Sequence, residues 1–229
     1  SGFQRTTIVA TDGHIETDTS QVGIDLISLE EDSARKLETK RSDIGETVVY
    51  NLDRLGIPLV EVATAPDVRS PEHAKETALA LGRLLRDTRR VRRGLGSIRQ
   101  DLNVSISCGD RVEIKGCQDL DWIPRIIRLE MARQLYFYQL ANELRSEFSL
   151  PPLPPDRESD SIPVENRVEV ATKKRIPYST HDVTECFSEC DSDMVSTSLQ
   201  NGSCVLGISL PGFSGKIGKK TTDEKGSQL

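Results

Sequence analysis

The chain has 229 residues, of which 36% are hydrophobic and 29% charged, and it carries a formal net charge of −6 at pH 7. This length suffices for one large domain or one and a half ordinary ones, and the composition is polar without being typical of disorder. The negative net charge argues against nucleic-acid binding by the surface as a whole, but a chain of this net charge can still carry a local basic patch.

Several features bear on the cellular compartment. No apolar run approaches the roughly 18 residues of a membrane span, and no signal peptide opens the sequence. Five cysteines without a C-x-x-C pair do not resemble a disulfide framework. We therefore expect a cytoplasmic protein. Because SGFQRTTIVA begins as if already inside a strand and without an initiator Met, we also expect a fragment.

The first 64 residues predict mainly strands. TTIVATDGHIETD carries Asp-Gly between two short alternating runs, which predicts a hairpin, and residues 22–29 alternate as a strand. Residues 33–40 could form either a helix or a loop, and the sequence does not decide between the two. Residues 46–64 hold two strands, VVYNLD and PLVEVAT, around the turn LGIP.

Two long helices are predicted. Ser70 as cap, Pro71 at the first helical position and Glu72 in the first turn begin a helix that runs to about Thr88. Six arginines between positions 83 and 93 form the only dense basic run, either a solvated face or a phosphate-binding surface. A second helix covers about 122–146, capped by Asp119 or Asp121. Its expected core stripe is Ile123, Ile127, Met131, Leu135 and Tyr138.

The stretch SIRQDLNVSISCGDRVEIK (97–115) predicts a hairpin with one apolar and one charged face. A loop of residues 107–109, with Gly109 left-handed, sets a register that places Asn103 opposite Glu113 and Asp101 opposite Lys115. Such a face is usually just solvated. Asp and Asn are poor strand formers, however, so their presence mid-strand favours a functional face.

The C-terminal third begins with LPPLPPD (150–156), a stiff proline-rich break that is the best domain boundary, or alternatively a peptide ligand. Beyond it come the stretches RVEVATK and HDVTECF, and we expect a short helix at SDMVSTSLQ and a strand at VLGISLP. Cys186, Cys190 and Cys204 offer a zinc alternative with poor spacing. The three histidines are expected at the surface.

Four ordered stretches resemble one family: LEEDSARK (29–36), NLDRLGIPLVEV (51–62), GSIRQDLNVSI (96–106) and VEIK (112–115). They are similar to the GatB/GatE family, the kinase-like subunits of tRNA-dependent amidotransferases. RGLGSIRQD resembles the archaeal GatE branch more than bacterial GatB. DVTECF and VLGISLPGFSG resemble the start of an insertion domain shared with bacterial-type aspartyl-tRNA synthetases.

The resemblance implies an α+β fold: an antiparallel-sheet cradle domain with flanking helices, plus part of a smaller α+β insertion domain. Residues 1–149 would form the cradle without its N-terminal part, 150–164 a proline-rich linker, and 165–229 the truncated start of the insertion domain. The family's N-terminal metal-site residues and C-terminal tRNA-gripping domains would be absent, so the activity of the fragment is left open.

The implied chemistry is a ligase reaction that forms a carbon–nitrogen bond. ATP and Mg²⁺ serve to phosphorylate the γ-carboxylate of Glu-tRNA(Gln), and ammonia from a GatD partner then gives Gln-tRNA(Gln), in a heterotetramer with GatD. Neither a P-loop nor a kinase glycine loop is present. The alternative is a non-catalytic tRNA-binding scaffold of the same fold.

Carboxylates from separate strands on one sheet face are a plausible Mg²⁺ site, and fixed cations would neutralise phosphate charge. The resemblance assigns the metal to Glu30 or Glu31 and to Glu61, Asp101 and Glu113, although a lone Glu61 also fits an exposed edge. It assigns phosphate binding to Arg99 and Lys115, with Arg54 as a weaker candidate. Asn103 would orient a metal-bound water or a carboxylate.

Overall fold

The computed structural model describes residues 5–42, 45–94, 96–156, 178–216, 218 and 220. It combines helices with antiparallel strands, which confirms the α+β class. The chain divides into two compact units. The first holds residues 1–102 and 114–127, and the second holds residues 103–113 and 128–229.

The first unit is built on a three-stranded antiparallel sheet, ordered β1 (Arg5–Glu16), β2 (Gln21–Glu31) and β5 (Pro58–Thr64). The expected hairpin at Asp12-Gly13 is wrong, because β1 runs straight through this dipeptide. Asp12 adopts a left-handed φ of 59°, and pairing resumes at Gly13 opposite Ile24. The actual turn follows β1, where the Thr17 hydroxyl donates to the Ser20 carbonyl at 2.6 Å.

An irregularity in β2 decides which side chains face the core. One extra residue lies in β2 between Ile24 and Leu26, where β5 advances only from Thr64 to Ala63. Such a bulge reverses the alternation of the strand. Ile24 and Ile27 consequently pack into the same hydrophobic cluster although they are three residues apart.

Helix α1 (Pro71–Asp87) covers the core side of this sheet. Ala80 and Leu81 of α1 pack against the buried cluster of Ile15, Val22 and Ile24. The predicted helix start is confirmed, since the Ser70 hydroxyl accepts a hydrogen bond from the His73 amide at 3.1 Å. The surface prediction for His73 is wrong. Its ring lies 3.1 Å from the Thr17 hydroxyl and the residue is only 2% exposed, because the first turn of α1 faces the β1–β2 turn.

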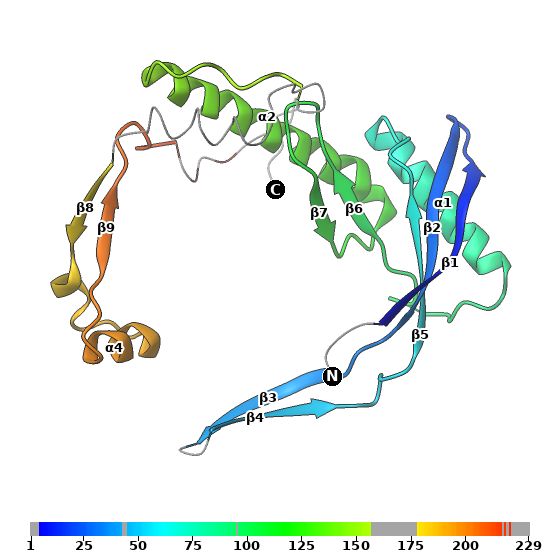
Figure 1. Cartoon of the computed structure of the whole chain (residues 1–229). Helices are drawn as coiled ribbons and strands as arrows, with labels where there is room; N and C mark the ends of the chain where they lie inside the picture. Colours follow the sequence, from blue (N-terminus) through cyan, green and yellow to red (C-terminus); the bar gives the residue numbers. More distant parts are fainter. Residues whose placement is uncertain are drawn as a thin grey trace. The chain divides into compact units, whose positions relative to one another are not determined.

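Most of the stretch 33–40 is a strand and not a helix or a loop, and only its first two residues, 33 and 34, lack regular structure. β3 (Arg35–Ser42) pairs with β4 (Gly45–Asn51) as a separate two-stranded ribbon (Figure 1). Pairing with a partner strand, which the local composition does not reveal, outweighs the polar character of β3. The predicted strands VVYNLD and PLVEVAT are both present, the first mostly in β4 and the second as β5.

The central hairpin exists but is shorter than expected, with β6 (Asp101–Val104) paired to β7 (Val112–Lys115). Side chains alternate as predicted, with Asp101 and Asn103 exposed and Val104 buried. The left-handed conformation expected for Gly109 is wrong. Glycine is required there because a Cβ at this position would clash with Oε1 of Gln134.

The second helix, α2 (Ile123–Glu147), follows the short helix η1 (Leu120–Trp122), whose cap is Asp119. Its predicted core stripe is wrong in part: Ile123 and Ile127 are buried, whereas Met131 and Leu135 are 38% and 45% exposed. Two polar residues, Glu130 and Gln134, take the buried positions instead because their side chains are hydrogen-bonded there.

The proline-rich segment 150–156 lies along the end of α2. The Leu153 amide donates to Asn142 Oδ1 at 2.7 Å, and the Tyr138 hydroxyl donates to the Leu153 carbonyl at 3.1 Å. The following residues 157–177, which include the stretch RVEVATK and most of the predicted linker, lie outside the described residues. The predicted domain limits therefore stay a prediction.

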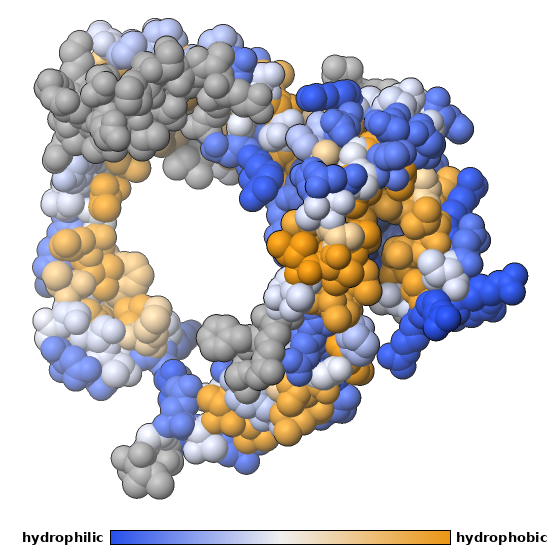
Figure 2. Space-filling view, turned by 45° about the vertical axis from the view of Figure 1, so that its right-hand side comes forward, coloured by the Kyte–Doolittle hydropathy of each residue, from blue (hydrophilic) through white to orange (hydrophobic). Residues whose placement is uncertain are grey.

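The last elements of the second unit are β8 (Ser179–Asp182), η2 (Thr184–Phe187), α4 (Asp193–Gln200) and β9 (Leu206–Ser209). β8 pairs antiparallel with β9, and both the short helix and the strand expected here are present. Figure 2 shows a hydrophobic patch over this hairpin and α4, where Met194, Leu206 and Ile208 are exposed. Among the described residues, no helix is both long and apolar enough to cross a membrane.

Candidate functional site

One face of the sheet in the first unit carries two of the predicted acids. Ser28 on β2 lies opposite Glu61 on β5, and its hydroxyl donates to Glu61 Oε2 at 3.3 Å. Glu30 lies two residues further along β2, and its Oε1 accepts a hydrogen bond from the Thr6 hydroxyl of β1 at 3.3 Å. We call Ser28, Glu30 and Glu61 the acidic face.

The acidic face points away from α1. Ile27 and Val62, the sequence neighbours of Ser28 and Glu61, pack against the core cluster under α1. Because neighbouring side chains of a strand point to opposite faces, Ser28 and Glu61 face the other side. Ser28 is nevertheless only 1% exposed, so its hydroxyl is a fixed donor to the Glu61 carboxylate.

Glu31 lies on the opposite face from Glu30, next to the turn before β5. Its Oε1 lies 3.8 Å from where a Cβ on Gly56 would be. Asp32 fixes the same turn: its amide donates to the Ile57 carbonyl at 2.9 Å and its carboxylate lies 3.8 Å from Arg54 Nε. Arg54, the weaker of the predicted phosphate contacts, is thus already paired with a carboxylate.

A second cluster of predicted residues lines a hollow of about 340 Å³ in the first unit. Its lining is Arg99, Gln100, Asp101, Lys115, Gly116 and Gln118. Lys115 Nζ lies 3.3 Å from Asp101 Oδ2, the partner that the expected register assigns to it. Arg99 is exposed at the same hollow. Two cations and one carboxylate give this hollow a positive balance, which suits an anionic group.

Three lining residues, Gln100, Gly116 and Gln118, were not singled out from the sequence. Gln100 donates from Nε2 to the Cys117 carbonyl at 2.8 Å, which ties the strand leading into β6 to the segment after β7. Burial raises the pKa of the Cys117 thiol, and the charge of Asp119 raises it further. Cys117 is therefore a packed, protonated thiol. The position of Gln100 inside SIRQD was the available signal.

Asn103 and Glu113 belong to the second unit, where both are exposed on the hairpin. Their predicted placement opposite each other stays a prediction. The same hairpin is fixed by Gln134 of α2, whose Nε2 donates to the Val104 carbonyl at 3.0 Å and whose Oε1 accepts from the Ile106 amide at 3.1 Å.

Glu130 completes this polar cluster on α2. Its carboxylate accepts from Gln134 Nε2 at 2.8 Å and from Arg133 Nε at 2.7 Å. Burial acts to raise the pKa of Glu130, but the hydrogen bonds from Arg133 and Gln134 outweigh it, so the pKa lies below its usual value. The same contact raises the pKa of Arg133. Glu130 is consequently ionised in the folded protein at neutral pH.

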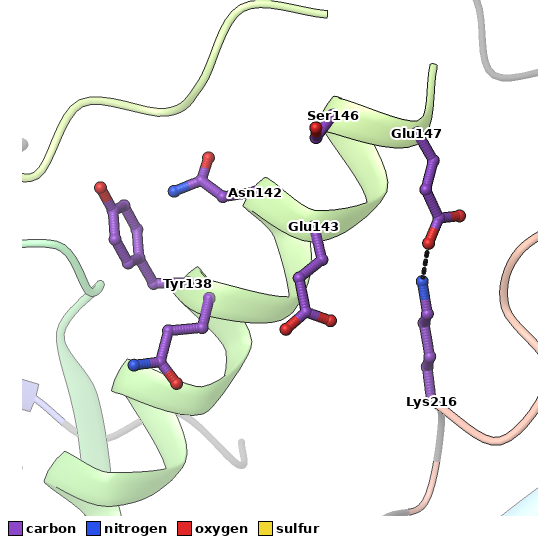
Figure 3. A pocket seen from close by; sticks show the side chains of 7 residues that line it. Tyr138, Asn142, Glu143, Ser146, Glu147 and Lys216 are labelled. Atoms are coloured by element: carbon purple, nitrogen blue, oxygen red, sulfur yellow. Dashed lines mark hydrogen bonds and ion pairs between the residues drawn. The ribbon is translucent and has the colours of Figure 1, made fainter. Parts of the chain in front are cut away.

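A wider, open hollow of about 760 Å³ lies along the second half of α2 in the same unit (Figure 3). It is lined by Tyr138, Gln139, Asn142, Glu143, Ser146, Glu147 and Lys216. Lys216 Nζ lies 2.7 Å from Glu147 Oε1, so its charge is compensated. None of these residues was predicted as a site from the sequence.

A match to a family model decides the relationship of the chain to known proteins. The model described as the GatB/GatE catalytic domain matches residues 1–186. The chain belongs to the GatB/GatE family. The matched range contains every residue that the resemblance assigned to metal or phosphate.

Relatives within the GatB/GatE family are named as the E subunit of glutamyl-tRNA(Gln) amidotransferase. The one from Methanocaldococcus jannaschii is 46% identical over 96% of this chain, and that from Pyrococcus furiosus is 46% identical over 95%. That from Sulfurisphaera tokodaii is 41% identical over 95%. The chain covers 30–31% of the length of these relatives, so it spans about a third of such a protein.

The GatB/GatE resemblance raises the question of a metal. Among the residues that the structure describes, no three or more Asp, Glu, His or Cys side chains are grouped to hold one. Glu30 and Glu61 are diagonal neighbours on adjacent strands, where side-chain positions lie roughly 7–8 Å apart. Mg²⁺ commonly binds one or two carboxylates and completes its shell with water and substrate phosphates. The oxygen donors of the acidic face fit such a metal.

Proposed function

We propose that this chain is part of the catalytic domain of a tRNA-dependent amidotransferase. The reaction is ATP-dependent phosphorylation of the γ-carboxylate of Glu-tRNA(Gln), followed by displacement of the phosphate by ammonia to give Gln-tRNA(Gln). The observation that carries the proposal is 46% identity over 96% of the chain to a protein named as the E subunit of glutamyl-tRNA(Gln) amidotransferase.

The hollow around Arg99 and Lys115 is the proposed phosphate-binding part. Phosphoryl transfer develops negative charge that fixed cations stabilise, and a lysine held in place by a carboxylate costs little reorganisation. The Asp101–Lys115 pair at 3.3 Å provides such a lysine. Arg99 adds a planar donor suited to two phosphate oxygens.

The acidic face is the proposed Mg²⁺ site, with Glu30 and Glu61 as ligands. Held by these carboxylates, Mg²⁺ would offset the negative charge of phosphate groups. Glu30 is favoured over Glu31 because it shares a face with Glu61. Ser28 positions the Glu61 carboxylate, and Thr6 the Glu30 carboxylate. Asp101, Asn103 and Glu113 remain proposed contributors from the hairpin.

The names of the relatives also suggest the partners. A protein named as one subunit of a tRNA amidotransferase implies an assembly acting on tRNA. We propose a GatD-type subunit as the ammonia source, a heterotetramer with it, and a cytoplasmic location. These proposals concern the full-length protein, of which the chain spans about a third.

The decisive variant is Asp101→Asn in the full-length protein assembled with its partner. We expect ATP-dependent phosphorylation of Glu-tRNA(Gln) to fall by roughly 10²–10³, because Lys115 loses its charged partner at the reacting group. Binding of tRNA, measured separately, should be retained. Asp18→Asn, in an exposed turn, is the matched control and should keep activity. Unchanged amidation by the Asp101 variant would instead favour the non-catalytic scaffold.

The metal assignment has its own comparison. Glu30→Gln and Glu61→Gln should each raise the Mg²⁺ concentration needed for half-maximal phosphorylation, whereas Glu31→Gln, one residue away on the other face, should not. Direct titration of Mn²⁺ into the protein, followed by electron paramagnetic resonance, gives a readout independent of activity. Equal effects of all three substitutions would refute the acidic face as the metal site.

A further inference from the structure

The run of six arginines after the middle of α1 is a feature that the proposed catalytic chemistry does not use. We define the arginine segment as residues 83–93, with arginines at 83, 86, 89, 90, 92 and 93. All six are exposed, and the segment contains a single acid, Asp87. This concentration of positive charge stands in a chain whose net charge is −6.

The backbone of the segment is held by hydrogen bonds as far as Arg90. Helix α1 ends at Asp87, and the hydroxyl of Thr88 donates to the Leu85 carbonyl at 2.6 Å and accepts from the Arg90 amide at 3.2 Å. Arg89 adopts a left-handed φ of 57°, and its amide bonds to the Arg86 carbonyl at 2.9 Å. The first four arginines are therefore presented by an ordered helix end and the turn that follows it (Figure 1), and Arg92 and Arg93 follow this turn in the chain.

These arginines differ from several basic residues elsewhere in the described part of the chain, which are ion-paired. Arg41, Lys75, Lys115 and Arg133 each lie within 3.4 Å of a carboxylate. Within the part of the chain that the structure describes, none of the six guanidiniums in the segment forms an ion pair. A cation near the C-terminus of a helix is favourable, which accounts for Arg86. It does not account for Arg89, Arg90, Arg92 and Arg93 beyond the helix, whose mutual repulsion is uncompensated.

We propose that the arginine segment is a docking surface for the phosphodiester backbone of the tRNA substrate. The inference rests on the proposed function for the identity of the RNA. Guanidinium groups match phosphate oxygens with two parallel hydrogen bonds, and backbone binding needs clustered positive charge. The segment contains no aromatic residue on which a base could stack. It thus contacts phosphates and does not read bases.

The test uses the full-length protein in its assembly, with Arg89, Arg90, Arg92 and Arg93 all changed to Gln. Affinity for uncharged tRNA is measured by fluorescence anisotropy between 50 and 200 mM KCl. Each lost phosphate contact lowers the slope of log K against log salt by about 0.7–0.9. The affinity of the wild-type protein falls between 50 and 200 mM KCl. If four contacts are lost, the factor of this fall should be about 50- to 150-fold smaller in the variant. Cognate and non-cognate tRNAs should weaken equally.

A matched control removes the same charge from the β3–β4 ribbon, by changing Arg35, Lys36, Lys40 and Arg41 to Gln. Three of these residues are already ion-paired, so the salt slope should change by less than about 1. The single variants R90Q and R92Q, at exposed positions, should each lower the slope by roughly 1 and guard against misfolding of the fourfold variant.

Three outcomes separate this inference from the proposed function. If the slope of log K against log salt is unchanged in the fourfold variant, the docking surface is overturned. The activity of the Asp101 variant tests the proposed function independently of this result. Loss of the partner protein in gel filtration, with the tRNA slope retained, would make the segment a protein interface and equally overturn the inference. Failure of the wild-type assembly to act on Glu-tRNA(Gln), with the slope change present, refutes the proposed function but leaves an RNA-binding surface.

Discussion

Gln134 anchors the central hairpin, and replacing it should be costly although it is a single uncharged side chain. In Gln134→Leu the shape is nearly kept, but three hydrogen bonds are lost. They join its amide to the Val104 carbonyl at 3.0 Å, the Ile106 amide at 3.1 Å and Glu130 at 2.8 Å. The residue is 5% exposed, so water replaces these bonds poorly.

The magnitude follows from the groups left behind. Each net hydrogen bond contributes about 1 kcal/mol, and a buried group without a partner costs about 1–3 kcal/mol. Allowing for partial hydration at the loop, Gln134→Leu should lower the free energy of unfolding by about 2–4 kcal/mol. With a urea dependence of typically 1–3 kcal/mol/M, the midpoint should fall by roughly 1–2 M.

The matched control is Gln139→Leu, an exposed position on the same helix, which should change stability by less than about 0.5 kcal/mol. Urea unfolding followed by circular dichroism gives the comparison, and hydrogen exchange of the Ile106 amide locates the effect. If the two variants unfold at the same urea concentration, Gln134 does not anchor the hairpin.

The remaining predictions concern local sites. Gly109→Ala should destabilise the protein by about 1–3 kcal/mol in thermal unfolding, because the added Cβ would clash with Gln134. Gly82→Ala, where α1 leaves open space, should instead stabilise it by roughly 0.5–1 kcal/mol. A higher stability of the Gly109 variant than of the Gly82 variant would contradict the geometry. Ser70→Ala should cost about 0.5–2 kcal/mol by loss of the α1 cap, and no change in the melting temperature would argue against that cap. The pKa of Glu130 is lower in the folded state, so its contribution to stability is present above the ordinary value of 4.5 and is lost as pH falls through the folded pKa. In Glu130→Gln, the free energy of unfolding measured with urea between pH 3 and 7 should therefore fall less steeply toward low pH than in the wild type. The same pH dependence in both proteins would refute this.

Signals confined to neighbouring residues were sufficient for part of the fold. The cap at Ser70 and the proline at 71 place the start of α1 correctly, because capping depends on residues within one turn. The alternation of Asp101, Leu102, Asn103 and Val104 gave the exposed and buried faces of β6. Within the site, the side chains of Asp101 and Lys115 lie 3.3 Å apart, a contact that the expected register predicts.

What the sequence did not reveal depends on partners far along the chain. β3 is a strand because β4 pairs with it, and the buried face of α2 includes Gln134 because the hairpin supplies its hydrogen-bond partners. Gly109 is required by the approach of that same side chain. Glu30 and Glu31 could not be told apart without the pairing of β2 with β5.

The extra residue in β2 restricts which insertions and deletions this strand can accept. Beyond it, even-numbered positions such as Ser28 and Glu30 share the face of Glu61, and odd-numbered ones lie on the side of α1. Loss or gain of one residue between positions 25 and 27 would exchange these faces and turn Glu31 toward Glu61. Length changes in this stretch should therefore occur in steps of two residues, or be matched by a compensating single change on the strand.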